Sequence, residues 1–334
     1  MPEKRILIIT DNLPDQINGV VTTFQNVERQ AKKDGYQISY IDPSRFPHWS
    51  APKYPEVKLS WPRRIGRLIR AAHPDYIHIA TEGPIGLAAR LWLDWRGLKY
   101  NTSYHTKFPE FMKKLYGIPE SLTYAYVRWF HKHSGRVLTT TDTMVRDLRA
   151  HGFRGDLRAW TRGVDRRVFD PALRNRSGGE KILLNVGRVS KEKNLDEFCK
   201  LSIPGTRKII VGDGPYRAEL EHRYPDVEFV GAKTGKALAE YYANADVFVF
   251  PSLTDTFGVV IIESLAVGTP VAAHPVPGPQ DILEEGITGY MSYSLQDAVE
   301  ICLDYPREKV VAASQRWTWE SCWQIFRDNL IDLR

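Results

Sequence analysis

The chain has 334 residues, of which 43% are hydrophobic and 26% are charged, values that are typical of a globular protein with a sizeable core. This length predicts two α/β domains rather than one. The apolar runs are too short to cross a bilayer, and the N-terminal residues lead directly into a predicted strand, so no secretory signal is expected. The three cysteines have no metal-ligand spacing, which favours free thiols in a reducing cytosol. The composition therefore excludes a membrane-spanning chain, a disulfide-stabilised secreted domain and a cysteine-based zinc module.

In chain order, short apolar runs alternate with amphipathic stretches. The strands predicted in the first half are residues 5–10, 37–41, 76–80, 99–104 and 136–139, and helical patterns lie at residues 20–33, 84–95 and 122–132. The rhythm then restarts, with predicted strands at residues 181–186, 208–211, 227–230, 247–250 and 270–273. Strand–helix–strand repetition of this kind is typical of a parallel sheet covered on both faces. We therefore expect two doubly wound α/β domains in tandem.

The predicted domain limits follow from composition. Residues 166–180 are rich in Arg, Pro, Ser and Gly and are predicted to form a linker. The expected domains are residues 1–167 and residues 168–315, followed by a C-terminal segment, residues 316–334, whose amphipathic helix should pack back on the first domain. Doubly wound domains bind ligands at the carboxyl ends of their strands, so a ligand is expected in the cleft between the two.

Positive charge is concentrated in the first half of the chain. Residues 1–170 contain 28 Lys and Arg against 17 Asp and Glu, whereas residues 171–334 contain 18 against 23. Such a basic half can face nucleic acid or an anionic membrane, or its basic residues can simply solvate helix faces. Two segments that mix basic with large apolar residues, 61–70 and 107–116, can lie on anionic lipid. The alternative for the first of them is a core helix with a basic outer face.

Two strand-to-helix loops in the second half contain residue types that suit a phosphate ligand. Gly187 begins the first loop, in which Arg188 and Lys193 can add formal charge to the positive end of a helix, enough to hold a diphosphate. Gly212 and Gly214 lie in the second loop and permit a tight turn. Taken alone, the first pattern also fits an ordinary basic surface loop, and the second fits a simple turn.

The strongest pattern is Pro-Ser-Leu-Thr-Asp-Thr-Phe-Gly-Val-Val-Ile-Ile-Glu at residues 251–263. A polar loop follows a predicted strand, and an apolar helix begins near Gly258, so the first-turn amides of that helix would be anion-binding donors. Asp255 precedes the helix, where its carboxylate can accept hydrogen bonds from sugar hydroxyls. Glu263 lies in an otherwise apolar helical run, where a carboxylate is costly unless it has hydrogen-bond partners. Ribose hydroxyls would supply such partners; a backbone amide or a basic neighbour is the structural alternative.

Together these motifs resemble those of retaining glycosyltransferases of family four, which have the GT-B fold of two Rossmann-like domains facing across a cleft. That family has a pair of glutamates separated by seven residues, and Asp255 and Glu263 match this pair with Asp in place of the first Glu. Within that family, the motifs resemble those of GDP-mannose-dependent mannosyltransferases and of diacylglycerol glycosyltransferases. The resemblance implies transfer of a hexose from a nucleotide-diphosphate sugar, GDP-mannose or UDP-hexose, to a lipid or glycan acceptor at the membrane surface.

The resemblance also implies site residues in both halves. The donor-binding positions are Gly19, Val20, Gly187, Gly212, Gly214, Val230, Thr256, Phe257, Gly258, Val259 and Glu263. The catalytic positions are His105, Asp255, Arg188 and Lys193, and the acceptor candidates are Glu82, Thr106 and Lys107. Since no residue is an evident nucleophile for the opposite face of the sugar, front-face departure and attack are favoured, with the diphosphate accepting the proton of the acceptor.

No metal ion or other cofactor is expected, because the chain contains no Asp-x-Asp, the pair with which the other main glycosyltransferase fold holds a metal. Arg188, Lys193 and a helix N-terminus would then stabilise the leaving diphosphate. No nucleic-acid partner is expected, and the protein is predicted to be cytoplasmic, or peripheral at the inner face of the plasma membrane if it contacts anionic lipid. The alternatives are a GT-B epimerase or phosphorylase, for which no motif is evident, and a non-catalytic binder of nucleotide sugars or nucleic acid.

Overall fold

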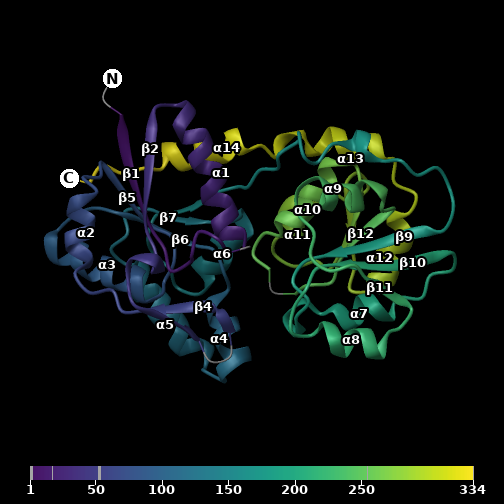
Figure 1. Cartoon of the computed structure of the whole chain (residues 1–334), viewed down its shortest axis with the longest axis horizontal. Coiled ribbons are helices and arrows are strands. Elements are labelled where there is room, and N and C mark those ends of the chain that lie inside the picture. The colour runs from purple at the N-terminus through teal and green to yellow at the C-terminus, as the bar shows by residue number, and fades with distance from the viewer. Residues whose placement is uncertain (1–2, 17, 52–53, 254, 334) are drawn as a thin grey trace. The chain divides into compact units, whose positions relative to one another are not determined.

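The computed structural model describes residues 3–16, 18–51, 54–253 and 255–333. The chain divides into two compact units, of which the first comprises Met1–Arg162 and Trp319–Arg334 and the second comprises Gly163–Thr318. In the described part of the chain, each unit is built around a six-stranded sheet whose strands are all parallel (Figure 1). No helix among these residues is long and apolar enough to span a bilayer.

The sheet of the first unit has the order β2-β1-β5-β6-β7-β8. Its strands are β1 (Lys4–Ile9), β2 (Tyr36–Ile41), β5 (Tyr76–Ile79), β6 (Asn101–Tyr104), β7 (Val137–Thr139) and β8 (Leu157–Ala159). The helices around it are α1 (Gly19–Lys33), α2 (Ile65–Ala71), α3 (Pro84–Arg96), α4 (Phe108–Tyr116), α5 (Glu120–His131) and α6 (Asp142–Ala150). A short hairpin of β3 (His48–Ala51) and β4 (Tyr54–Ser60) follows β2. The sequence predicted the first five strands of the sheet but neither β8 nor the hairpin.

Apolar side chains are buried on both faces of this sheet. In β1, Ile6 and Ile8 pack in one hydrophobic cluster, whereas Leu7 and Ile9 pack in another. Successive side chains of a strand point to opposite faces, so a continuous apolar run is what a sheet covered on both sides requires. The same cluster that contains Ile6 also contains buried aromatic residues from the C-terminal helix.

The C-terminal helix, α14 (Trp319–Asp328), belongs to the first unit, where it packs beside α1 (Figure 1). Trp323 and Phe326 are buried, and the indole Nε1 of Trp160 donates a hydrogen bond to the carbonyl of Cys322 at 2.9 Å. The predicted helix at 317–333 is therefore present but shorter. It ends early because the last residues leave the helix to form an antiparallel bridge with the start of β5.

The sheet of the second unit has the order β11-β10-β9-β12-β13-β14. Its strands are β9 (Lys181–Val186), β10 (Thr206–Val211), β11 (Val227–Phe229), β12 (Val247–Phe250), β13 (Val271–Ala273) and β14 (Gly289–Met291). Its helices are α7 (Leu195–Lys200), α8 (Arg217–Arg223), α9 (Gly235–Asn244), α10 (Val259–Ala266), α11 (Pro279–Ile282), α12 (Leu295–Cys302) and α13 (Arg307–Ala313), with short 3-10 turns at Pro171–Leu173, Lys191–Lys193 and Ser314–Arg316. The sequence predicted five of these strands and missed β14.

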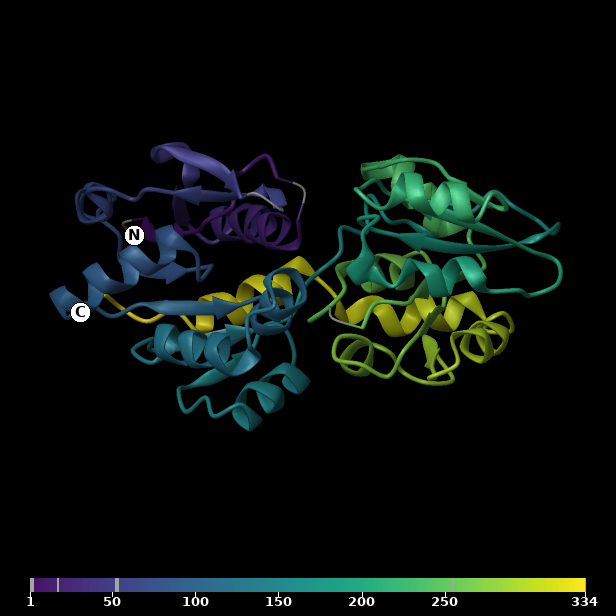
Figure 2. The same ribbon diagram turned by 90° about the horizontal axis from the view of Figure 1, so that it is seen from below.

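Helices cover both faces of the second sheet, as Figure 2 shows. Leu184 and Phe248 pack with α9 and α10 on one face, while Leu183 and Val249 pack with α7 and α12 on the other. The unit is therefore a three-layer doubly wound domain, as its alternating strands and helices predicted.

Residues 166–180, which the sequence predicts as a linker, lie within the second unit. Arg174 and Arg176 form ion pairs with Asp246 at 3.0 and 3.1 Å. The boundary between the units falls earlier, after Arg162. The composition of this segment suggested an exposed connection, but two of its arginines pair with Asp246, the residue before β12.

Each sheet has one point at which the strand order reverses direction. In the first unit this point lies between β1 and β5, and in the second unit it lies between β9 and β12. The loops that leave the carboxyl ends of two such neighbouring strands run to opposite faces and leave a crevice, where doubly wound domains bind their ligands. The search for a site therefore begins with the loops after these four strands.

Candidate active site

In the second unit, an ion pair lies at the point where the strand order reverses. Lys193 follows β9, Asp255 follows β12, and the ammonium Nζ lies 2.7 Å from Oδ1 and 3.0 Å from Oδ2 of the carboxylate. Burial alone would raise the pKa of Asp255, but the Lys193 charge and hydrogen bonds outweigh it and hold the pKa below its usual value. The loop cation and the loop carboxylate predicted from the sequence are thus in direct contact, and the contact favours the ionised form of the carboxylate.

Helix α10 begins directly after this loop. Gly258 occupies its N-cap position with φ of 85°, a left-handed conformation that strains other residues. A Cβ there would also lie 3.0 Å from the Ile261 side chain. Because Gly258 has no side chain, the N-cap residue of α10 makes no side-chain hydrogen bond to the first amides of the helix. These amides, together with the positive end of the helix dipole, are available to an anion.

Glu263 lies on α10 and is partly buried. Its carboxylate Oε2 accepts a hydrogen bond of 3.1 Å from the phenol of Tyr242. Burial raises the pKa of Glu263 to about 7, and the Tyr242 hydrogen bond offsets this only in part. The partner within the protein is therefore a phenol rather than the amide or basic neighbour of the structural alternative, and it leaves the ionised form poorly compensated.

Glycine occurs in the two neighbouring loops for different physical reasons. A Cβ on Gly212 would lie 1.8 Å from the carbonyl oxygen of Gly187, and one on Gly214 would lie 2.4 Å from that of Val189. The two loops pack backbone to backbone, and this contact alone requires glycine at positions 212 and 214. A Cβ on Gly187, by contrast, would meet no described atom within 4 Å. Among these three, Gly187 is the position that leaves open space for a ligand.

The other predicted donor-binding residues of this unit lie close along the chain to these loops. Arg188 is partly buried in the loop after β9, and Thr256 is buried beside Asp255. The ring of Phe257 is buried against Trp317 in an edge-on contact. Val230 directly follows β11 and extends the sheet, since its amide donates to the carbonyl of Ile210 at 3.1 Å.

A hydrogen-bonded cluster that the sequence did not reveal joins three loops of this sheet. The Nδ2 of Asn194 donates to Glu197 at 2.6 Å and to the carbonyl of Pro251 at 3.2 Å. His274, after β13, lies 2.9 Å from the same carboxylate. The cluster ties the loop of Lys193 to the loop of Asp255, so it sets the position of the ion pair. The one residue of the cluster that could be noticed in the sequence is Asn194, since asparagine tolerates the left-handed conformation that it adopts here, with φ of 55°.

In the first unit, the helix N-termini near the reversal point are already capped. Asn18 accepts hydrogen bonds from the amides of Val20 and Val21 at the start of α1, both at 3.0 Å. Asp11, after β1, accepts from the amide of Ile85 at the start of α3 at 2.7 Å. These caps distinguish α1 and α3 from α10. Gly19 is at the first position of α1, and a Cβ added there would meet no described atom within 4 Å.

Asp11 also ties together the loops at this reversal point. Its carboxylate accepts a hydrogen bond from the hydroxyl of Thr81, after β5, at 2.8 Å. Burial raises the pKa of Asp11 to about 6, although the amide and hydroxyl donors oppose this. A Cβ on Gly83 would lie 2.5 Å from the same carboxyl group. No local pattern in the sequence indicates this network, because Asp11 and Thr81 are far apart along the chain.

His105, which follows β6, is held by Arg162. The Arg162 Nη2 lies 2.9 Å from the imidazole Nδ1. Burial lowers the pKa of His105 well below its usual value, and the charge of Arg162 lowers it further. His105 is therefore neutral in the physiological range.

The acceptor candidates have partners of their own within the first unit. The carboxylate Oε1 of Glu82 lies 3.2 Å from Nε2 of His131, and Lys107 lies 4.0 Å from the carboxylate of Asp147. Thr106 is exposed. Roles for these three residues in acceptor binding remain predictions.

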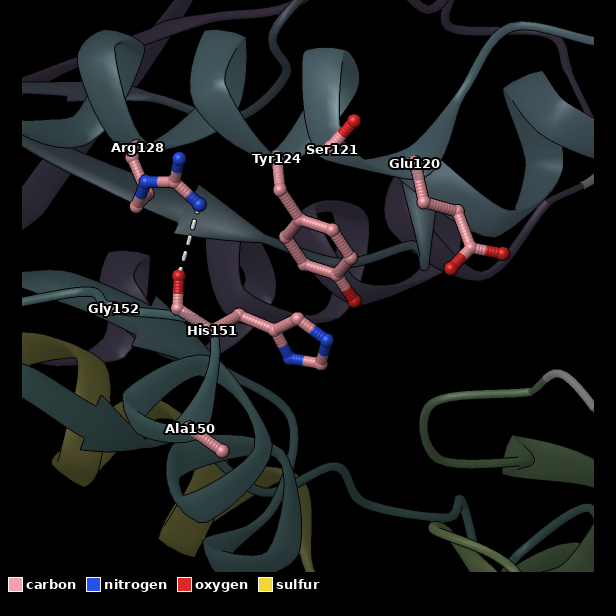
Figure 3. A pocket seen from close by; sticks show the side chains of 7 residues that line it. All are labelled: Glu120, Ser121, Tyr124, Arg128, Ala150, His151 and Gly152. Atoms are coloured by element: carbon pink, nitrogen blue, oxygen red, sulfur yellow. Dashed lines mark hydrogen bonds between the residues drawn. The ribbon is translucent and has the colours of Figure 1, made fainter.

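A hollow of about 500 Å³ in the first unit contains none of the predicted site residues. Figure 3 shows the ring of Tyr124 beside that of His151; the two stack with centroids 3.9 Å apart. Arg128 donates a hydrogen bond to the carbonyl of His151 at 3.0 Å. These contacts hold α5 against the end of α6, which is a packing role.

Two family models match most of the chain. The model described as Glycosyltransferase Family 4 matches residues 17–168, and the model described as Glycosyl transferases group 1 matches residues 169–300. A GDP-mannose-dependent alpha-mannosyltransferase from Mycobacterium tuberculosis is 30% identical, over 98% of this chain and 95% of its own length. The chain belongs to the group 1, family four glycosyltransferases. The prediction that it is a glycosyltransferase is thereby confirmed.

Two further comparisons give another sequence relative and a similar solved structure. An alpha-monoglucosyldiacylglycerol synthase from Streptococcus pneumoniae is 26% identical, over 90% of this chain and 78% of its own length. A sucrose-phosphate synthase from Thermosynechococcus elongatus has a similar structure, with a TM-score of 0.76 at 19% identity over 97% of this chain and 98% of that one. At that identity the likeness concerns the fold. The predicted GT-B fold, with two Rossmann-like units and a C-terminal helix on the first, is confirmed.

Proposed function

We propose that this glycosyltransferase moves a hexose from a nucleotide-diphosphate sugar, GDP-mannose or UDP-hexose, to a lipid or glycan acceptor, with retention of configuration and without a metal ion. The observation that carries the proposal is the contact of Lys193 with Asp255 at the reversal point of the second sheet, beside the uncapped start of α10. A cation and open helix amides suit a diphosphate, and a carboxylate next to them suits the hydroxyls of the sugar.

The ion pair has capacity to spare for a donor. An ammonium has three N–H donors, and two of those of Lys193 can bond Oδ1 and Oδ2 of Asp255. The third N–H can still point to a phosphate oxygen. The carboxylate likewise keeps lone pairs for sugar hydroxyls. In this proposal Lys193, Arg188 and the α10 amides take up the negative charge that the diphosphate gains as its bond to the sugar breaks. Asp255 and His105 orient the sugar, and Glu263 binds the ribose.

Front-face transfer fits these residues. In such a reaction the acceptor oxygen attacks on the face from which the diphosphate departs, and the acceptor proton passes to a phosphate oxygen. No protein nucleophile is then needed. Among the described residues, no three His, Cys, Asp or Glu side chains are grouped as a metal site would require. Metal independence remains a proposal that transfer assays in the presence of a chelator will test.

Thermal-shift measurements with GDP, UDP and their sugars test the donor. Selective binding of one nucleotide raises the apparent stability by an amount that grows with the logarithm of its affinity. GDP-mannose is the first donor to try, since the relative that is 30% identical is a GDP-mannose-dependent mannosyltransferase. Loops after β11 are the place to look for base selection. If neither nucleotide shifts the melting temperature, and neither sugar is transferred or hydrolysed, the proposal is wrong.

Gly19 offers a test of the donor-binding role of the first unit. The Gly19→Ala variant should be as stable as the parent or more so, because alanine is the better helix former by up to about 1 kcal/mol and its Cβ meets no described atom. If the backbone at this position approaches the donor phosphates, the same variant should lose about tenfold in kcat/KM. Thermal melts and transfer assays measure the two effects separately. Unchanged turnover would remove Gly19 from the site.

An apolar groove in the first unit supports an acceptor at a membrane. The groove has a volume of about 420 Å³ and is lined by Trp49, Leu59, Ser60, Trp61, Pro62, Pro84, Leu87, Ala88 and Leu91. The side chains of Trp49, Trp61 and Leu91 are about half exposed. Large apolar side chains gathered at a surface are typical of contact with a protein or a lipid.

Arginines lie along the chain next to this groove. Helix α2 is a core helix with a basic outer face, because Ile65 and Ile69 are buried whereas Arg67 and Arg70 are exposed. Arg63, two residues before the helix, is exposed as well. Tryptophan beside arginine suits the headgroup region of an anionic bilayer. The other basic segment supports this less, since its Lys113 is paired with a glutamate at 2.9 Å.

Vesicle binding tests the membrane contact. The Arg63→Gln and Arg67→Gln variants should each weaken binding to vesicles of phosphatidylcholine and phosphatidylglycerol about fivefold, since a basic residue contributes about 1 kcal/mol near such a surface. The Trp61→Ser variant should weaken it at low and at high salt alike, whereas Tyr293→Ser, which changes an exposed aromatic residue of the second unit, should not. Absence of vesicle binding by the parent protein at low salt would contradict the proposal.

A further inference from the structure

The contact between His105 and Arg162 fixes the position of a proton. The two atoms that meet are Nδ1 of the imidazole and Nη2 of the guanidinium, 2.9 Å apart. A guanidinium has five N–H donors and no acceptor, and it stays protonated in proteins. Nδ1 must therefore be the acceptor, with its lone pair toward Arg162. In a neutral imidazole the one ring proton then resides on Nε2.

Arg162 is itself held firmly. It is 3% exposed, its Nη1 donates to the carbonyls of Trp160 and Thr161 at 2.6 and 2.9 Å, and its guanidinium carbon lies 4.5 Å from the centre of the Trp160 ring. Trp160 is in turn tied to α14 through the carbonyl of Cys322. A planar guanidinium fixed in this way presents its Nη2 to His105 in one direction.

Three groups near His105 disfavour a second proton: Arg162, His78 on β5 and His131 on α5. The rings of Phe24 and Trp160 pack against the imidazole. The carboxylate of Glu82 lies against His131. Burial and these groups together hold the pKa of His105 well below its usual value.

We propose that Arg162 is a positioning residue that keeps His105 as the neutral tautomer with its proton on Nε2, so that His105 donates a hydrogen bond to an oxygen of the transferred sugar. This inference rests on the proposed glycosyl transfer. It adds that His105 is a permanent donor and does not take up the proton of the acceptor. It also gives the arginine of the Arg-Gly-Val-Asp segment a role in sugar recognition.

Nuclear magnetic resonance of the protein labelled with ¹⁵N-histidine tests the tautomer without any activity assay. The His105 signals, assigned by comparison with His105→Asn, should show a protonated Nε2 and an unprotonated Nδ1, unchanged across the range in which ordinary histidines titrate, around pH 6.5. A proton on Nδ1, or protonation of both nitrogens in that range, would overturn the proposal. This result does not depend on a donor, so it stands or falls apart from the proposed function.

Two variants connect the tautomer to transfer. In Arg162→Met, Nδ1 of His105 loses its donor, so both neutral tautomers should appear in the nitrogen signals, and kcat/KM for the nucleotide sugar should fall at least tenfold. Binding of the nucleoside diphosphate alone should not change. Arg162→Lys, which keeps an N–H donor at this position, should restore the Nε2 tautomer and the rate in part. If Arg162→Met keeps the parent tautomer, Arg162 is merely structural.

Discussion

The Lys193→Met variant should transfer sugar about a hundredfold more slowly than the parent protein. Loss of one preorganised group that stabilises developing charge commonly costs about 3 kcal/mol in the transition state, and Lys193 is placed at the reversal point where the diphosphate is proposed to bind. The loss should appear in kcat as much as in kcat/KM, because the charge on the diphosphate grows as its bond to the sugar breaks. Steady-state transfer assays with the preferred donor measure it.

The ion pair itself complicates this test, and a second variant separates the two effects. Without Lys193, the carboxylate of Asp255 loses the charge that holds its pKa low, so the protein should also become less stable by about 1–3 kcal/mol. The double variant Lys193→Met with Asp255→Asn removes the uncompensated charge. It should recover the stability of the parent but not its rate.

Lys191 provides the matched control. It lies two residues before Lys193 in the same loop, it is largely exposed, and its partner is Glu219 at 3.5 Å. Lys191→Met should leave transfer within about twofold of the parent, since exposed ion pairs contribute little. Equal losses in Lys191→Met and Lys193→Met would show that the loop needs its net charge rather than a cation at position 193, and would remove the proposed role.

The two sheets could be predicted because their strands are encoded locally. β12 is a continuous apolar run, Val-Phe-Val-Phe, and β9 contains the run Ile-Leu-Leu; such runs stand out in any sequence. β8 and β14 could not be predicted in the same way. Each has three residues, Leu-Arg-Ala and Gly-Tyr-Met, and each lies at the edge of its sheet. An edge strand is buried less on its outer side and so needs fewer apolar residues to form.

The loops of the site could be predicted for a similar reason, but the contacts between them could not. Glycines and charged residues after a strand are a local pattern, which is how Lys193 and Asp255 were found separately. They are 62 residues apart, and they meet because β9 and β12 are neighbours in the sheet. Arg162 and His105 are 57 residues apart, and no local pattern reveals their hydrogen bond. Contacts of this kind depend on strand order, which the sequence does not state.

Replacing Glu263 by glutamine should stabilise the free protein and weaken donor binding. The pKa of Glu263 rises from its ordinary value of 4.5 to about 7 in the folded protein. A carboxyl group with a raised pKa contributes stability below its ordinary pKa and loses that contribution as the pH rises through the folded value. The parent should therefore lose about 3 kcal/mol of unfolding free energy between about pH 4.5 and pH 7 from this group.

The glutamine variant has no charge to bury and should not show this loss. Its advantage over the parent should grow between about pH 4.5 and pH 7 and then stay constant, reaching roughly 2–3 kcal/mol at about pH 8. Urea unfolding at several pH values measures it. Tyr242→Phe is the control, since removing the phenol donor that Glu263 now has should move the midpoint to higher pH without abolishing the effect. A variant with the parent's pH dependence would contradict the assignment.

A carboxylate kept at this energetic disadvantage is best explained by a ligand that relieves it. Ribose hydroxyls are two donors of the kind that Glu263 lacks, and hydrogen bonds to a charged acceptor contribute about 1.5–3 kcal/mol each. Donor binding should then favour the ionised form, so affinity for the nucleoside diphosphate should rise as the pH increases from about 6 to about 8, with release of a proton on binding below the folded pKa. Calorimetric titrations in buffers of different ionisation enthalpy detect that proton. In Glu263→Gln the affinity should fall at least tenfold near pH 8 and lose its pH dependence, because the amide cannot release a proton. If the glutamine variant binds as tightly as the parent, the raised pKa reflects packing alone, and the ribose must be bound by other residues.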